Sequence, residues 1–197
     1  SYGDMSEQFR SASGKRIVDD IRDMREFFGW SRSIDDLLAE RQRYFDEEIA
    51  RSDLRLMKSV ERFVRALHAR GIILAVTSSA VRSSIETILR RFDLLPLFSA
   101  IVEGAEVQRG KPDPQAYAMT AERLDAEPAR CVVFEDSTVG VRAAKAAGMY
   151  CIAVRNPRAQ VFQDLSAADA IVSSFDELDP QWFVTAAPRS RSARPRA

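Results

Sequence analysis

Apolar and polar positions follow two different patterns along this chain. From 6 to 52, apolar residues recur at every third or fourth position among many charges, and no β-like run interrupts them. From 53 to about 178, short β-branched runs alternate with amphipathic stretches. We predict helices at 56–69, 80–91, 113–124 and 138–147, and strands at 72–77, 99–103, 131–135, 150–154 and 170–173.

This alternation predicts an α/β fold. A helix between successive short strands makes crossover units, which build a parallel sheet with helices on both faces. Gly71 and Gly148 stand at helix-to-strand joints, where glycine typically ends a helix. We therefore expect a doubly wound, Rossmann-like parallel sheet over 55–180, preceded by a small helical cap domain over 1–54. We expect an Arg-rich, disordered tail over 181–197.

Composition narrows the class of protein. Apolar residues make up 46% of the chain, and no apolar run approaches the roughly 20 residues of a membrane span. Cys131 and Cys151 lie in strand-like runs, as free thiols do in a reducing compartment, so we expect a cytoplasmic protein. Basic and acidic residues number 29 each, but 186–197 holds four arginines and no acid. The rest of the chain is mildly acidic, which argues against nucleic acid as the partner.

Candidate chemistry lies where the predicted strands end, because ligands of open parallel sheets bind at the carboxyl ends of the strands. Thr77, Ser78 and Ser79 combine hydroxyls with backbone N–H groups at a helix start. That combination suits an anion, and it equally suits an ordinary N-cap. Lys111 stands in the stiff turn Gly110-Lys111-Pro112-Asp113-Pro114. It could serve as a point charge for phosphate or belong to a plain surface turn.

Glu135 and Asp136 end the apolar strand that begins at Cys131. Adjacent carboxylates repel each other unless they are solvated, paired with a basic residue or bound to a cation. Mg²⁺ is a suitable cation, since it accepts one or two protein carboxylates and keeps several waters. Capping of the next helix is the alternative reading. Taken with Thr77 and Lys111, the pair predicts a Mg²⁺-assisted phosphoryl site.

The order of these motifs resembles the haloacid dehalogenase superfamily, in its β-phosphoglucomutase-like and phosphoglycolate-phosphatase-like branch. The second, third and fourth motifs are matched by Thr77-Ser78-Ser79, by the Lys111 turn, and by Phe134-Glu135-Asp136-Ser137 with Gly140. The resemblance implies that Thr77 and the Ser78 backbone bind the phosphoryl group and that Lys111 neutralises it. It implies Mg²⁺ on Asp136 and Glu135, directly or through water. A phosphatase of sugar phosphates or phosphoglycolate-like acids follows, with a β-phosphoglucomutase as the alternative.

The helical stretch 6–52 is similar to the cap of that branch. The cap loop, here Ser13-Gly14-Lys15-Arg16, would lie over the active site and help to select the substrate. Lys15 and Arg16 are therefore candidate substrate-binding residues, and the fork of Arg16 suits a second anionic group. A solvated surface is the alternative for Arg16. The expected partner is a small phosphorylated molecule, with no membrane or nucleic acid, and the expected state is a monomer or weak homodimer.

The first motif of the family, Asp-x-Asp on the first strand, has no match here. Its first Asp attacks phosphorus to form an aspartyl phosphate. Asp4 follows no apolar strand, and Asp19-Asp20 lies in a helical pattern. The resemblance puts the absent strand between those that end at Thr77 and Asp136, so we expect two exposed strand edges there. We expect the nucleophile to lie outside this sequence. A strand from another chain and a non-catalytic, phosphate-binding homologue are the alternatives.

Overall fold

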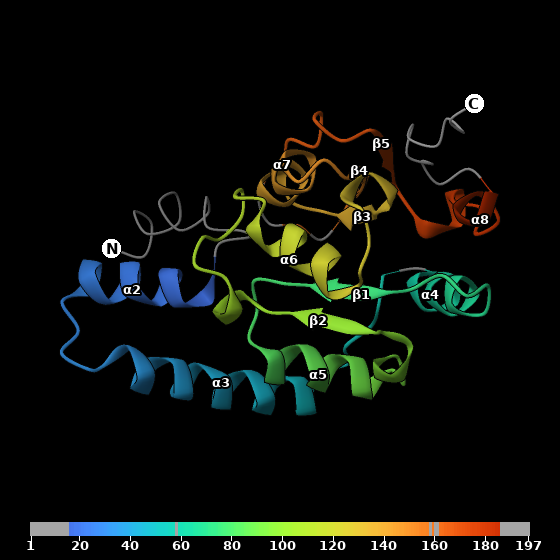
Figure 1. Cartoon of the computed structure of the whole chain (residues 1–197). Coiled ribbons are helices and arrows are strands. Elements are labelled where there is room, and N and C mark those ends of the chain that lie inside the picture. Colours follow the sequence, from blue (N-terminus) through green and yellow to red (C-terminus); the bar gives the residue numbers. More distant parts are fainter. Residues whose placement is uncertain (1–15, 58, 158, 160–161, 186–197) are drawn as a thin grey trace.

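The computed structural model describes residues 16–57, 59–157, 159 and 162–185. Figure 1 shows two helices at the start of this part, followed by helices that alternate with short strands. The helices are α2 (Ile17–Phe28), α3 (Ile34–Arg51), α4 (Val60–His68), α5 (Arg82–Arg91), α6 (Gln115–Arg123), α7 (Thr138–Ala146) and α8 (Trp182–Thr185). The strands are β1 (Ala75–Thr77), β2 (Ala100–Val102), β3 (Val132–Glu135), β4 (Tyr150–Val154) and β5 (Ala170–Val172).

The helical character predicted for the N-terminal stretch is confirmed by α2 and α3. Gly29 ends α2 in a left-handed conformation with φ of 64°, which glycine adopts without a side-chain clash. The Ser33 hydroxyl begins α3 by accepting a hydrogen bond from the Asp36 backbone at 3.1 Å. α3 packs along α5, and Ser84 of α5 donates to the Gln42 side chain of α3 at 2.8 Å. The helical pair therefore lies directly against the α/β part of the chain.

The strands are parallel, as predicted, and both faces of the sheet are covered. β3, β4 and β5 form one ladder, in which Phe134 pairs with Ile152 and Ile152 with Ala170. Alternate residues of β4 enter two different cores: Cys151 packs in the cluster that contains α7 residues, and Ile152 packs in the cluster that contains α4 and α8 residues. This two-sided burial is what a doubly wound α/β fold requires.

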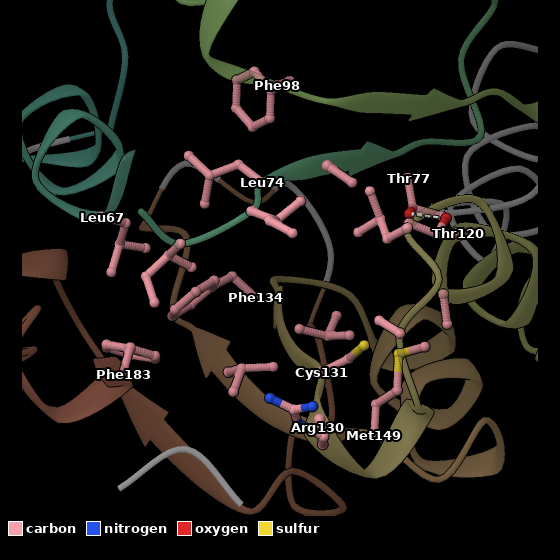
Figure 2. Close-up of a pocket in the computed structure, with 18 of the residues that line it drawn as sticks. Leu67, Leu74, Thr77, Phe98, Thr120, Arg130, Cys131, Phe134, Met149 and Phe183 are labelled. Carbon is pink, nitrogen blue, oxygen red and sulfur yellow. Dashed lines mark hydrogen bonds between the residues drawn. The ribbon is translucent and has the colours of Figure 1, made fainter. Parts of the chain in front are cut away.

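The expected single sheet is divided into two ladders. In the described part of the chain β1 pairs only with β2, with Ala75 opposite Ala100, and β3 begins the second ladder. A groove of about 1230 Å³ separates β1 from β3. Figure 2 shows Leu74 and Thr77 on its β1 side, Phe134 on its β3 side, and Leu67 and Thr120 on the flanking helices. Among the described residues no strand pairs with these two edges, which lie where the resemblance puts the absent strand.

The C-terminal boundary of the core needs a correction. The tail was predicted to begin at 181, but Trp182–Thr185 form α8. Phe183 is only 6% exposed, and its ring lies 5.5 Å from that of Phe63 and 5.7 Å from that of Phe134. The sequence pattern missed this helix because it is one turn long. Two aromatic side chains against the sheet nevertheless bury enough apolar area to hold it.

Two further findings bear on the class of protein. In the part of the chain that the structure describes, no helix combines the length and the apolar character needed to cross a membrane. Cys131 and Cys151 are free thiols. Burial raises the pKa of Cys151 to about 12, so this thiol stays protonated and packs as a small apolar group.

Candidate active site

The carboxyl ends of β1, β2 and β3 bring the predicted residues to one edge of the fold. Glycine allows the loops after β1 and β2 to approach each other: a Cβ at Gly104 would lie 2.4 Å from the Ser79 carbonyl oxygen. The Gly104 backbone N–H donates to the Ala80 carbonyl at 3.1 Å. The loop after β1 is thus held in place by the loop after β2.

Lys111 and Glu135 form a buried ion pair. The Lys111 ammonium lies 2.5 Å from Glu135 Oε1, and the two side chains are only 8% and 7% exposed. A third group, Tyr117 of α6, joins them. Its hydroxyl accepts from Lys111 at 3.0 Å and donates to Glu135 Oε1. The structure therefore brings together two residues that stand 24 positions apart in the sequence.

Glu135 is held on its other side by the start of α7. Its Oε2 accepts from the backbone N–H groups of Asp136 at 3.2 Å and Ser137 at 3.3 Å, and from the Ser137 hydroxyl at 3.0 Å. Gly140 provides the space, because a Cβ there would lie 2.0 Å from the Glu135 carboxyl carbon. Burial alone would raise the pKa of Glu135, but the charge and hydrogen bond of Lys111, with bonds from Tyr117 and Ser137, lower it overall.

Asp136 differs from its neighbour because it is exposed at the strand end. Its Oδ2 accepts one hydrogen bond, from the Asn156 side chain at 3.1 Å. Among the described residues there is no group of three or more His, Cys, Asp or Glu side chains that could hold a metal. One exposed carboxylate with a fixed orientation still fits Mg²⁺, which keeps several waters and needs few protein ligands. Glu135 fits a role through water, since both its oxygens already accept hydrogen bonds.

The loop after β1 differs from the expected helix start. The helix predicted from 80 begins at Arg82, whose backbone N–H donates to a carboxylate oxygen of Glu103 at 2.5 Å. A resident carboxylate thus already caps this helix. The Ser78 backbone N–H donates to the Val102 carbonyl at 3.0 Å, and the Ser78 hydroxyl accepts from the Ala80 N–H at 3.1 Å. The assignment of Ser78 and Ser79 to a phosphate stays a prediction.

Thr77 points from the end of β1 towards α6. Its hydroxyl oxygen lies 2.7 Å from that of Thr120, as the dashed line in Figure 2 shows. Thr120 also donates to the Ala116 carbonyl at 2.8 Å. A hydroxyl has one proton, so the proton between the two threonines comes from Thr77. Thr77 would have to turn away from Thr120 before it could donate to a phosphoryl oxygen.

Arg16 connects the first helix to the Lys111 loop. Its guanidinium donates to both carboxylate oxygens of Asp19, at 2.6 and 2.7 Å, and to the Val107 carbonyl at 2.6 Å. Its side chain also lies against Gly110, where a Cβ would be 2.8 Å from Arg16 Cγ. The hydrogen bond and charge of Arg16 lower the pKa of Asp19 despite partial burial. Lys15, the other predicted cap residue, lies outside the described residues.

A family model for haloacid dehalogenase-like hydrolases matches residues 6–148. The chain belongs to this family. The membership predicted from three short motifs is therefore confirmed.

The curated relatives include several phosphatases. The chain is 33% identical over 157 residues to the chloroplastic 5-amino-6-(5-phospho-D-ribitylamino)uracil phosphatase of Arabidopsis thaliana, covering 78% of this chain and 41% of that protein. It is 40% identical over 111 residues to the phosphorylated carbohydrates phosphatase of Thermotoga maritima, covering 56% and 49%. CbbY of Rhodobacter sphaeroides, solved with xylulose-(1,5)bisphosphate, superposes with a TM-score of 0.71 at 29% identity, covering 76% and 67%. The chain thus spans about half the length, or less, of these two curated relatives.

Three residues that contact the candidate site are not predicted from the sequence. Tyr117 and Thr120 lie one turn apart on α6 and contact Lys111 and Thr77, and Asn156 contacts Asp136. Asn156 follows a predicted strand end, which was a usable signal. Tyr117 and Thr120 carried no such signal, because a tyrosine and a threonine in an amphipathic helix are most simply read as packing residues.

Proposed function

We propose that this protein is a Mg²⁺-dependent phosphatase of small phosphorylated metabolites, with sugar phosphates or phosphoglycolate-like acids as the substrate class. The observation that carries the proposal is the buried Lys111–Glu135 pair beside the exposed carboxylate of Asp136. A cation held by Asp136 and a fixed ammonium would flank one phosphoryl group. Family membership and the printed names of the relatives support phosphate ester chemistry.

The roles of this chain's residues follow from the contacts. Lys111 uses two of its three ammonium protons on Tyr117 and Glu135, which leaves one for a phosphoryl oxygen. Thr77 would turn from Thr120 to donate a second hydrogen bond. Asp136, oriented by Asn156, would hold Mg²⁺, and Glu135 would act on it through water. When bound, Mg²⁺ supplies positive charge that stabilises the negative charge of the transition state.

The attacking group belongs to the same proposal. We assign the nucleophilic Asp to a strand that lies in the groove between β1 and β3, outside the residues described. The carboxyl end of a parallel strand in that groove would emerge between Thr77 and Glu135. Its first Asp would attack phosphorus, while the second Asp of the Asp-x-Asp motif would protonate the departing alcohol oxygen and then take a proton from the water that hydrolyses the aspartyl phosphate to inorganic phosphate.

Phosphate release tests the proposal. The complete gene product is incubated with p-nitrophenyl phosphate and with a panel of sugar phosphates and phosphoglycolate, in Mg²⁺ and in excess chelator. We expect turnover that requires Mg²⁺ and falls at least about 100-fold in Asp136→Asn and Lys111→Met. Turnover that persists in chelator and in both variants would contradict it.

The location of the nucleophile needs a second assay. The 197-residue chain alone is expected to release no phosphate. If this chain does turn over p-nitrophenyl phosphate, and Asp136→Asn abolishes that turnover, then the nucleophile lies within the chain. The expectation that the nucleophile lies outside this sequence would then be wrong.

A further inference from the structure

Tyr117 occupies a position that neither the motifs nor the family match explains. It lies in the first turns of α6, is only 4% exposed, and its hydroxyl stands between the ammonium of Lys111 and the carboxylate of Glu135. The Lys111 nitrogen also lies 4.8 Å from the centre of the Tyr117 ring. Lys111 therefore contacts both the hydroxyl oxygen and the ring of Tyr117.

These contacts decide the direction of the ammonium group. Lysine has a flexible four-carbon stem, and an ion pair with one carboxylate oxygen sets a distance without setting the orientation of the other protons. A second acceptor, the Tyr117 hydroxyl, fixes the rotation of the ammonium. The Tyr117 hydroxyl itself donates to Glu135 Oε1, so both acceptors lie on one side of the ammonium, and its remaining N–H points away from that side. That third proton is the one available to a phosphoryl oxygen.

The other contacts of Glu135 imply that loss of the Tyr117 hydroxyl would change the orientation of the Lys111 ammonium without unfolding the protein. Without the Tyr117 oxygen, Glu135 still has the Lys111 ion pair and three donors from Asp136 and Ser137. The buried carboxylate therefore keeps its compensation, and the fold should persist. The variant loses the second fixed point of the Lys111 ammonium and one of the donors to Glu135 Oε1.

We propose that Tyr117 is a positioning residue that aims the free proton of Lys111 at the phosphoryl group. The proposal rests on the proposed phosphatase function. It assigns to α6 a role in orienting the charge that Lys111 brings to the site. Because that charge is needed most in the transition state, Tyr117 should affect kcat more than KM.

Kinetics of Tyr117→Phe test this role in the complete gene product, with p-nitrophenyl phosphate as substrate. The variant keeps the ring and removes one oxygen. We expect kcat to fall about 10- to 100-fold, the size of losing a hydrogen bond to a charged group, with KM within about twofold. Tyr150→Phe is the matched control, because Tyr150 is half-buried on β4 and packs on Trp182. Its kcat should match the wild type.

A double-mutant cycle distinguishes positioning from general weakening of the structure. If Tyr117 acts through Lys111, then Tyr117→Phe should change kcat less than about twofold in a Lys111→Met background. Equal losses in both backgrounds, or wild-type kcat in the single variant, would overturn the inference while leaving the phosphatase activity itself established.

Nitrogen NMR gives a readout that does not need turnover. A lysine ammonium held by two buried acceptors should exchange its protons slowly and give a protected ¹⁵N resonance, which Lys111→Met would identify. We expect that protection in the wild type and its loss in Tyr117→Phe. Absence of a protected Lys111 resonance would contradict the inference, even if no substrate were turned over and the proposed function had failed.

Discussion

Replacing Gly140 by alanine would place a methyl carbon 2.0 Å from the Glu135 carboxyl carbon and 2.1 Å from both of its oxygens. Such a contact is impossible, so the carboxylate or the start of α7 must move. The carboxylate would then lose its geometry to Lys111, Tyr117 and Ser137. A substitution that adds a single methyl group would thus disturb the centre of the candidate site.

The expected change in the free energy of unfolding is the sum of two opposing effects. In an ordinary helix, glycine to alanine stabilises by about 1 kcal/mol. Disrupting a buried ion pair destabilises by about 3–5 kcal/mol when one charge loses its partner. We therefore expect Gly140→Ala to lower the free energy of unfolding by about 2–4 kcal/mol, the opposite sign to the helix-propensity effect.

Urea unfolding of four proteins measures this: wild type, Gly140→Ala, Glu135→Ala and the double variant. In the Glu135→Ala background the methyl group meets no carboxylate, so Gly140→Ala should become neutral or stabilising. Gly29→Ala is a control, since its φ is 64° and no atom lies near its Cβ position; it should cost about 1–2 kcal/mol. A Gly140→Ala protein as stable as the wild type would refute the steric reasoning.

Three further outcomes are expected. Because folding lowers the pKa of Glu135, its contribution to stability is present above the ordinary carboxyl pKa of about 4.3 and is lost as the pH falls through the lower folded pKa. Urea unfolding from pH 6 to pH 2 should show this loss of stability. An unchanged dependence of stability on pH in Glu135→Gln would argue against it. Asn156→Ala should weaken Mg²⁺ binding about tenfold by freeing Asp136, as read by calorimetry, whereas unchanged affinity would place the ion elsewhere. Phe183→Ala should destabilise by about 3–5 kcal/mol in denaturant unfolding if α8 belongs to the core, and a loss below 1 kcal/mol would exclude that.

The order of helices and strands was predictable because it depends on local periodicity. The strands ending at Thr77 and Glu135 and the helices after them lie close to where the pattern put them. The ends of the helices were less predictable. The helix predicted from 80 begins at Arg82 because Glu103, from a different loop, caps it there. α8 was missed because its stability comes from the ring contacts of Phe183 rather than from its own four residues.

The candidate site also has a part that was predictable from the sequence and a part that was not. Thr77, Lys111, Glu135 and Asp136 were predictable because parallel strands bring their carboxyl ends to one edge, whatever the details of packing. The distinct surroundings of the two carboxylates were not predictable. Glu135 is buried and bonded through both oxygens, while Asp136 is exposed, and this difference depends on the space that Gly140 leaves at the start of α7.

The sequence by itself determined the α/β order, the family and the chemical types of the site residues, because these depend on spacing along one chain. Only the tertiary structure decided which groups meet. It joined Lys111, Tyr117 and Glu135 in one buried cluster, turned Thr77 towards Thr120, and left a groove between β1 and β3. Burial, the single proton of a hydroxyl and the volume of a methyl group are properties of three-dimensional packing, and no pattern along the chain records them.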